Sequence, residues 1–290
     1  MDAPLFWSDS YCSMNQQTKM SAKYEFGQRS HPFEFIYDAS MGRVKSPGKA
    51  TFGGIWLSDE KGTTELYCKI YSQIFRDLGP QREIEIIFPP EYFYPAIFTP
   101  QHIALTTLDF LNVYTDINFH IEISAWSLLS MSKGNRKKNR QFESLGGDIK
   151  MATENEYPLA YEVLKKNREA RGVTLTMQQD KFIKNLVTLP TKYKLYLAKI
   201  GNEIAAVAYV VRISERVNYV LFWGDSLEFR HLSPIASMLK FLVGESKSDR
   251  CMTLDLGISS VDGNLDIGLA RFKRNLGGIE AFKRTFRYIE

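Results

Sequence analysis

The residues best suited to chemistry lie near the end of the chain, in the stretch Cys251–Ser260. Asp255 falls inside an apolar strand pattern that ends at Gly257 and Ser259. A buried carboxylate needs a partner, because its pKa otherwise rises. Two roles are therefore open for Asp255: a base for an amine nucleophile, or a structural group bonded to the backbone near Ser259.

A helix is predicted immediately after this strand, over Leu265–Asn275. Its apolar residues recur at helical spacing: Leu265, Leu269, Phe272 and Leu276. Gly277 is typical of a left-handed C-terminal cap. Lys273 lies in the last turn, where a cation suits the helix dipole. On this pattern alone, the stretch is a strand–turn–helix unit of an α/β domain.

A second chemical signal is a basic segment, in which five of the eight residues from Lys133 to Arg140 are Lys or Arg. Arg136 and Lys137 lie at its centre. Such cations recognise phosphates and carboxylates, so the segment is a candidate substrate contact. The alternative is a solvated helix start or linker.

A third signal is Ser233-Pro234, which predicts a helix start with serine as N-cap and proline at the first helical position. A helix N-terminus exposes N–H groups and the positive end of its dipole, and it can hold an anion without a side-chain motif. Arg230 and His231 stand just before it. We predict a phosphate or carboxylate clamp here, with an exposed loop as the alternative.

Three more positions are candidate substrate contacts: Ser259, at the end of the stretch Cys251–Ser260, and two positions elsewhere in the chain. Trp223 ends a predicted strand and could line a pocket, although aromatic strand residues are more often core, and the same holds for Tyr219. Gly54 belongs to a glycine pair inside a predicted strand, which marks a bulge or a close approach to the backbone.

Composition excludes several classes. The 290 residues have 44% hydrophobic and 24% charged content, as in soluble globular proteins, and a net charge of +4 that favours anionic partners only weakly. Three distant cysteines and four scattered histidines give no metal-ligand spacing, so no metal is expected. We find no secretory signal, and the apolar run Ile204–Val211 is too short to span a bilayer. A cytoplasmic protein without a transmembrane segment is expected.

The element pattern predicts three parts. Residues 1–30 are polar and are expected to form a loosely ordered arm. Residues 31–130 read as a lobe of mixed strands and helices, with a clear amphipathic helix over Thr63–Leu78. Residues 131–290 predict helix, helix, three antiparallel strands, helix, strand, helix and a terminal strand. This order is that of Gcn5-related N-acetyltransferases (GNAT), although a fold does not settle a function.

Several pieces in order resemble the C-terminal half of FemAB-like acyltransferases, which contain two GNAT-type lobes. They are Ser132-Lys133-x-x-Arg136-Lys137, Gly201-x-x-Ile204-Ala205-Ala206, Tyr219-x-x-x-Trp223-Gly224, Asp255-x-Gly257-x-Ser259 and Gly268-Leu269-x-x-Phe272-Lys273. The resemblance implies an α/β fold of tandem GNAT-like lobes, the first degenerate, each with a mixed, mostly antiparallel sheet flanked by helices. It also implies that Lys273 lies at the cleft, where it would stabilise charge on a reacting carbonyl.

The function implied is N-acyl transfer to an amine of a cell-envelope or polysaccharide precursor, such as an amino sugar or nucleotide sugar. The segment 228–234 lacks the glycines of the usual coenzyme A loop. FemAB-like proteins also depart there, and their peptidoglycan members use aminoacyl-tRNA. No room exists for a helical-arm insertion between Gly172 and Thr191, which favours acyl-CoA over tRNA. The alternative is a non-catalytic module that binds an anionic glycan or RNA.

Overall fold

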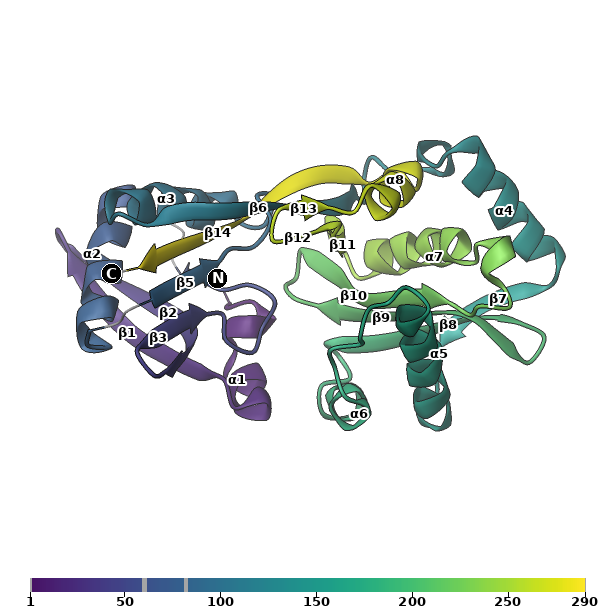
Figure 1. Ribbon diagram of the computed structural model, residues 1–290, viewed down its shortest axis with the longest axis horizontal. Helices are drawn as coiled ribbons and strands as arrows, with labels where there is room; N and C mark the ends of the chain where they lie inside the picture. Colours follow the sequence, from purple (N-terminus) through teal and green to yellow (C-terminus); the bar gives the residue numbers. More distant parts are fainter. Residues whose placement is uncertain (1, 59–61, 81–82, 290) are drawn as a thin grey trace. The chain divides into compact units, whose positions relative to one another are not determined.

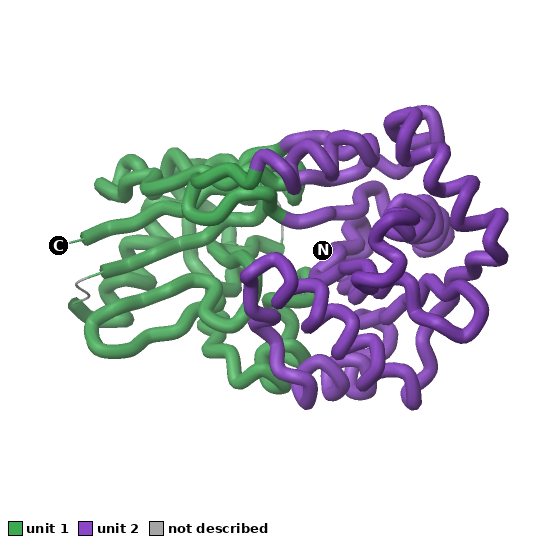
Figure 2. The backbone as a smooth tube through the Cα atoms, turned by 45° about the vertical axis from the view of Figure 1, so that its right-hand side comes forward, with its two compact units in different colours: residues 1–118, 258–266, 281–290 green, residues 119–257, 267–280 purple. Residues whose placement is uncertain are grey.

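A computed structural model describes residues 2–58, 62–80 and 83–289, and these form two compact units. Unit 1 comprises 1–118, 258–266 and 281–290, and unit 2 comprises 119–257 and 267–280 (Figure 2). The sequence placed all of 131–290 in one lobe, whereas two C-terminal segments cluster with the N-terminal residues.

Unit 1 is built on strands in the order β1-β2-β3-β5-β14-β6, with β4 paired to β2 (Figure 1). Its elements are η1 (Leu5–Trp7), α1 (Asp9–Asn15), β1 (Thr18–Phe26), β2 (Arg29–Ser40), β3 (Arg43–Ser46), β4 (Ile55–Leu57), α2 (Thr64–Asp77), β5 (Glu83–Ile87), α3 (Pro95–Thr107), β6 (Leu111–Glu122), β12 (Ser260–Val261), β13 (Asn264–Leu265) and β14 (Ile279–Ile289). Strands β6 and β14 each contribute residues to both units.

The expected arm at residues 1–30 is wrong. Leu5, Phe6 and Trp7 are buried, and the Trp7 indole N–H donates to the Gly54 carbonyl (3.1 Å). Strand β1 pairs with β2 over its whole length, from Thr18 to Phe26. Met20, Ala22, Tyr24 and Phe26 alternate with polar residues as in a strand, so the sequence does contain a strand signal, although no β1 side chain is buried.

Unit 2 has the strand order β6-β11-β10-β9-β8-β7. Its elements are η2 (Leu128–Ser130), α4 (Lys133–Ser144), β7 (Gly147–Met151), η3 (Glu154–Glu156), α5 (Tyr157–Glu169), α6 (Gln179–Thr188), β8 (Tyr193–Ile200), β9 (Glu203–Arg212), β10 (Val217–Asp225), η4 (Arg230–Leu232), α7 (Ile235–Ser248), β11 (Thr253–Ile258, whose last residue falls in unit 1) and α8 (Ile267–Asn275). The three predicted antiparallel strands are confirmed as β8, β9 and β10.

Helices cover both faces of the unit 2 strands. Leu195 and Tyr196 are neighbours on β8, so their side chains point to opposite faces. Tyr196 packs on Phe241 of α7, whereas Tyr209, which is paired with Leu195, packs on Phe182 of α6. Helix α7 therefore covers one face and α6 the other (Figure 1).

Candidate functional site

The site is organised by two parallel strands that pair only briefly. Strands β10 and β11 are in register from Val217↔Thr253 to Tyr219↔Asp255, after which their pairing ends. Strand β10 carries an extra residue, Leu221, relative to β9, which is a β-bulge at this point. Bulges bend a strand and end pairing. Backbone groups beyond Tyr219 and Asp255 are therefore not committed to a β10–β11 ladder.

Lys273 reaches the point where these strands separate. Its side chain extends from α8 and is only 2% exposed, and its Nζ donates to the Gly257 carbonyl on β11 (2.8 Å). The same Nζ lies 5.9 Å from the centre of the Phe119 ring. Gly277 has φ +87°, as predicted for a left-handed cap at the end of α8. Helix α8 therefore places an ammonium group that is almost fully shielded from solvent at the end of β11.

Gly257 leaves space beside that cation. Its φ is +78°, which other residues adopt only with strain. A Cβ added there would lie 3.7 Å from the Tyr219 hydroxyl oxygen and 4.0 Å from Lys273 Nζ. The missing side chain therefore marks a position flanked by a phenol and an ammonium group.

Asp255 is the carboxylate of this region and is also 2% exposed. Its Oδ1 accepts a hydrogen bond from the Gly257 N–H (2.7 Å). This contact favours the structural role, because it holds the turn that presents the Gly257 carbonyl to Lys273. The role of Asp255 as a base stays a prediction.

Arg168 on α5 is a candidate site residue that the sequence did not predict. Its guanidinium lies 5.6 Å from the centre of the Phe222 ring on β10, just past the bulge. Burial foremost, and then the charge of Arg171, lower the pKa of Arg168, while Tyr219 acts in the opposite direction. The sequence predicts this helix over Asn155–Arg171 with Leu159, Val163 and Leu164 inward. Leu164 is buried, but Leu159 is 60% exposed, and the buried face also includes Ala160, Tyr161 and Asn167.

The start of α7 differs from its prediction. The helix begins at Ile235 with Pro234 as N-cap, and Ser233 adopts a left-handed conformation (φ +48°) instead of capping it. Arg230 Nε lies 3.5 Å from Asp225 Oδ1, and His231 Nδ1 is 3.0 Å from the Glu228 carbonyl. No side-chain cap occupies the first N–H groups of α7. The end of this helix therefore remains available to an anion.

The family profile described as acetyltransferase (GNAT) domain matches residues 130–274, which is half of the chain. The chain belongs to this GNAT family. None of the curated protein sequences matches it significantly. The match includes Lys273, Tyr219 and the whole of α7, so the geometry described above lies inside the GNAT domain.

Solved structures show the same fold over the whole chain. FemX aligns with a TM-score of 0.74 at 14% identity, covering 99% of this chain and 92% of FemX. L-PGS from Bacillus licheniformis gives 0.59 at 11% identity, covering 90% and 84%. A tandem GNAT protein from the clavulanic acid biosynthesis pathway, solved without AcCoA, gives 0.54 at 9% identity, covering 94% and 83%. These likenesses confirm the predicted α/β fold of tandem GNAT-like lobes.

The other predicted contacts of the GNAT domain divide into two kinds. Trp223 packs near Phe272, with ring centres 6.2 Å apart, which brings it to the helix that carries Lys273. Arg136 instead donates through Nη1 to the carbonyls of Met131 (2.6 Å) and Leu129 (3.4 Å). Lys137 is exposed on α4.

Two predicted residues belong to unit 1. Ser259 is buried, and its Oγ has no hydrogen-bond partner in the described part of the chain. Gly54 has both backbone groups engaged, its N–H by Ser46 Oγ (3.0 Å) and its carbonyl by Trp7. An added Cβ would lie 2.9 Å from the Phe88 ring, so core packing accounts for this glycine. Substrate contacts by either residue stay predictions.

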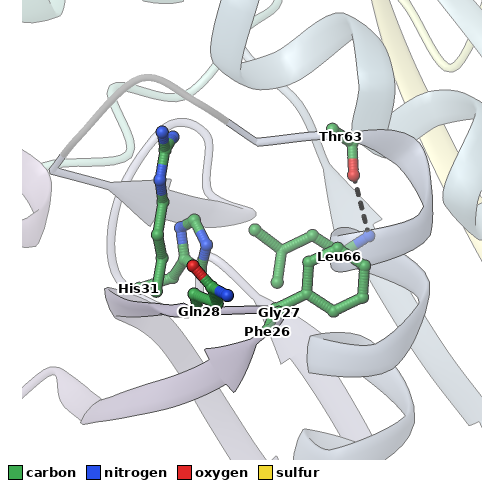
Figure 3. Close-up of a pocket in the computed structure, with 7 residues that line it drawn as sticks. Phe26, Gly27, Gln28, His31, Thr63 and Leu66 are labelled. Atoms are coloured by element: carbon green, nitrogen blue, oxygen red, sulfur yellow. Dashed lines mark hydrogen bonds between the residues drawn. The ribbon is translucent and has the colours of Figure 1, made fainter.

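Unit 1 also has a shallow depression of about 400 Å³ between the β1–β2 turn and the start of α2 (Figure 3). It is lined by Phe26, Gly27, Gln28, Arg29, His31, Thr63 and Leu66. Thr63 Oγ1 accepts the Leu66 N–H there (3.2 Å), which is the predicted cap of this helix. None of the predicted site residues lines it.

The described residues contain no group of three or more His, Cys, Asp or Glu side chains placed to hold a metal ion. Within the same ranges, no helix combines the length and the apolar character needed to cross a bilayer.

Proposed function

We propose that this protein is an N-acyltransferase that moves an acyl group from an activated donor to an amine of a cell-envelope or polysaccharide precursor, such as an amino sugar. The observation that carries the proposal is the buried Lys273 Nζ, held by the Gly257 carbonyl where β10 and β11 stop pairing. The GNAT family of the chain supplies the reaction class.

The reaction forms a C–N bond and breaks the bond to the donor's leaving group. When the amine attacks a thioester carbonyl, the oxygen becomes an oxyanion, and collapse of this intermediate expels the thiolate, which takes up the proton that the amine loses. Lys273 lies beside the vacant position at Gly257, so its ammonium group is placed to stabilise that oxyanion. Such a reaction needs positioned substrates and no protein nucleophile.

Acyl-CoA is the favoured donor, with aminoacyl-tRNA the less favoured one. The uncapped N-terminus of the 14-residue helix α7 can hold the pyrophosphate of coenzyme A through backbone N–H groups, even without a glycine loop. Ser237 in the first turn fits this assignment, because its buried Oγ has no partner among the described residues. Arg230, His231 and Ser233 would be the flanking contacts. Between α5 and β8, the described chain holds the single helix α6.

The acceptor assignment rests on the resemblance to FemAB-like acyltransferases and on the likeness in fold to FemX. Trp223, beside the helix that carries Lys273, follows Phe222 on β10 and faces the α7 side of the strands, so we assign it to the acyl group that meets the acceptor there. An amino sugar or nucleotide amino sugar offers the required nucleophilic amine together with hydroxyl or phosphate groups for orientation.

The test is incubation of the purified protein with a panel of acyl-CoAs and amino-sugar nucleotides, with thiol release and product mass as readouts. We expect turnover with at least one pair, and a rise in Tm with coenzyme A alone. Absence of both turnover and thermal shift across the panel would contradict the proposal.

One observation favours a second function. The exposed cations of α4, among them Lys133, Lys137 and Arg140, make no ion pair within the described residues, as expected if a GNAT module had kept only anion binding. In that case an anionic glycan or RNA would bind with a steep salt dependence and no acyl transfer would occur.

A further inference from the structure

Arg168 presents a cation without a counter-charge. Its guanidinium is partly buried over Phe222, and it makes no hydrogen bond or ion pair with any residue of the described ranges. Arginine cannot become neutral by losing a proton at physiological pH. Withdrawing a charge from water without a partner is costly, so such a group is retained where something else supplies the anion.

The surrounding residues do not supply it. The charged groups that act on Arg168 are Arg171, which repels it, and Tyr219, which attracts it only when ionised. The nearest acidic residue on β10 is Asp225, which is already engaged by Arg230 and by Asn167. Asn167 is 2% exposed and donates through Nδ2 to both the Asp225 carbonyl and Oδ1, each at 2.7 Å.

That asparagine also fixes the geometry. It anchors the last turns of α5 to the end of β10, and Gly224 allows the close approach because an added Cβ would lie 2.7 Å from the Asn167 amide carbon. Arg168 is the next residue, so its backbone position is set by a rigid contact. A pre-positioned fork of N–H donors is the geometry that recognises carboxylates and phosphates bidentately.

The position of Arg168 assigns the anion to one substrate. Phe222 packs against Tyr209, with ring centres 6.3 Å apart, and Tyr209 faces α6. Arg168 therefore lies on the face of the unit 2 strands that α5 and α6 cover, opposite to α7. A donor held by the α7 N-terminus approaches from the other face. The anion at Arg168 then belongs to the acceptor.

We infer that Arg168 binds an oxyanion, phosphate or carboxylate, of the acyl acceptor, on the side of the sheet opposite to the donor. The assignment of this anion to the acceptor rests on the proposed function, whereas the presence of an anion site at Arg168 does not depend on it. It narrows the acceptor from an amine in general to an amine that carries an acidic group, such as a sugar phosphate or nucleotide amino sugar.

The experiment measures binding of inorganic pyrophosphate by calorimetry at low salt in the presence of saturating coenzyme A, so that the α7 N-terminus is already occupied, and binding of coenzyme A in a separate titration. The proteins compared are the wild type, Arg168→Met, Arg168→Lys and Lys166→Met. Lys166 is an exposed cation on the same helix and serves as the matched control. We expect Arg168→Met to weaken pyrophosphate binding at least tenfold, Arg168→Lys to weaken it less, and Lys166→Met to change it less than twofold. Coenzyme A binding should stay the same in all four proteins.

Each of the other possible results would overturn one part of the inference. Equal pyrophosphate binding by the wild type and Arg168→Met would overturn the anion site. Parallel loss of coenzyme A binding would overturn the acceptor assignment, because the anion would then be the donor's. Unchanged Tm values would show that Arg168→Met folds, and Arg168→Lys gives a second measurement if it does not. If acyl transfer is never observed but Arg168-dependent anion binding is, the proposed function fails while the site stands.

Discussion

Two regions of unit 2 carry cations, and they use them in opposite ways. Helix α4 contains the densest run of charge in the sequence, yet Lys133, Lys137 and Arg140 are exposed. Near the separation of β10 and β11 there are two cations, Lys273 from α8, which is buried, and Arg168 from α5, which is partly buried. Exposed charges are solvated and screened, whereas buried ones interact strongly with whatever lies nearby.

The start of α4 has a structural task instead. Ser132 N–H and Asn135 Nδ2 both donate to the Asn275 carbonyl at the end of α8, at 2.8 and 3.0 Å. Arg136 donates hydrogen bonds to backbone carbonyls that precede the helix. These contacts satisfy a helix end that would otherwise lack partners. The basic segment therefore helps to place the helix that carries Lys273, and its polar residues matter here more than its net charge.

Replacing Lys273 is the largest test of this difference. Lys273→Met should lower kcat by about 100-fold to 1,000-fold, because loss of one preorganised donor to an oxyanion has effects of that order. The free energy of unfolding should change little, since methionine fills the space without the cost of burying a charge. Steady-state kinetics with the best donor and acceptor, and urea unfolding, provide the two measurements.

Lys137→Met is the matched control, since it removes a lysine from a helix with high local charge but full exposure. Its kcat should stay within twofold of the wild type. A Lys273→Met enzyme with wild-type kcat would show that the buried cation is structural and would remove Lys273 from the reaction.

The position of Lys273 could be predicted from the sequence, although its role stays a prediction. Lys273 was found because the α8 helix and its Gly277 cap follow from local patterns, and because the resemblance placed that helix at the cleft. Tyr219 was considered only as one of two aromatic strand residues. Nothing local shows that its hydroxyl oxygen and Lys273 both lie close to Gly257, since this depends on where β10 and β11 separate.

Arg168 was missed for a different physical reason. The helix itself was predicted, with its apolar residues Leu159, Val163 and Leu164 as the inner face, and of these only Leu164 is buried. The buried face instead includes Asn167, whose amide hydrogen bonds to Asp225 replace apolar contact. A polar residue such as Asn167 that is buried against a partner distant in sequence does not add to the apolar periodicity of its helix. The spacing Tyr161, Leu164, Asn167 would have been the available signal.

His102 in unit 1 extends the comparison, because a partly buried histidine, unlike Arg168, can lose its charge by releasing a proton. Its ring on α3 packs between Phe88 and Phe286, with ring centres 4.5 and 5.4 Å away. Burial foremost, and then Arg284, lower the pKa of His102 to about 4. The unfolded chain binds this proton near pH 6.5, so the contribution of His102 to stability is complete above that pH and is lost as pH falls toward 4.

His102→Phe should remove this dependence, since phenylalanine keeps the aromatic packing and does not titrate. Between pH 7 and pH 4 the free energy of unfolding of the wild type should fall by about 3 kcal/mol more than that of the variant. Urea unfolding at both pH values measures the difference. Parallel losses in the two proteins would mean that His102 is protonated without cost and is not excluded from water.

The change with the smallest expected effect, in the exposed cations of α4, is also the most direct test of the difference between α4 and the cations near the separation of β10 and β11. A double variant, Lys137→Ala with Arg140→Ala, removes two exposed cations of α4 and leaves the contacts of Ser132, Asn135 and Arg136 in place. In the enzyme that we propose, kcat/KM should stay within twofold and show only weak salt dependence, because these charges are solvated. Filter binding with a homopolymer RNA and with an anionic glycan, at 50 and 200 mM salt, covers the alternative. If the double variant lost more than tenfold in affinity for either polymer while Lys273→Met lost none, charge density on α4 would define the functional surface and the buried cations would not.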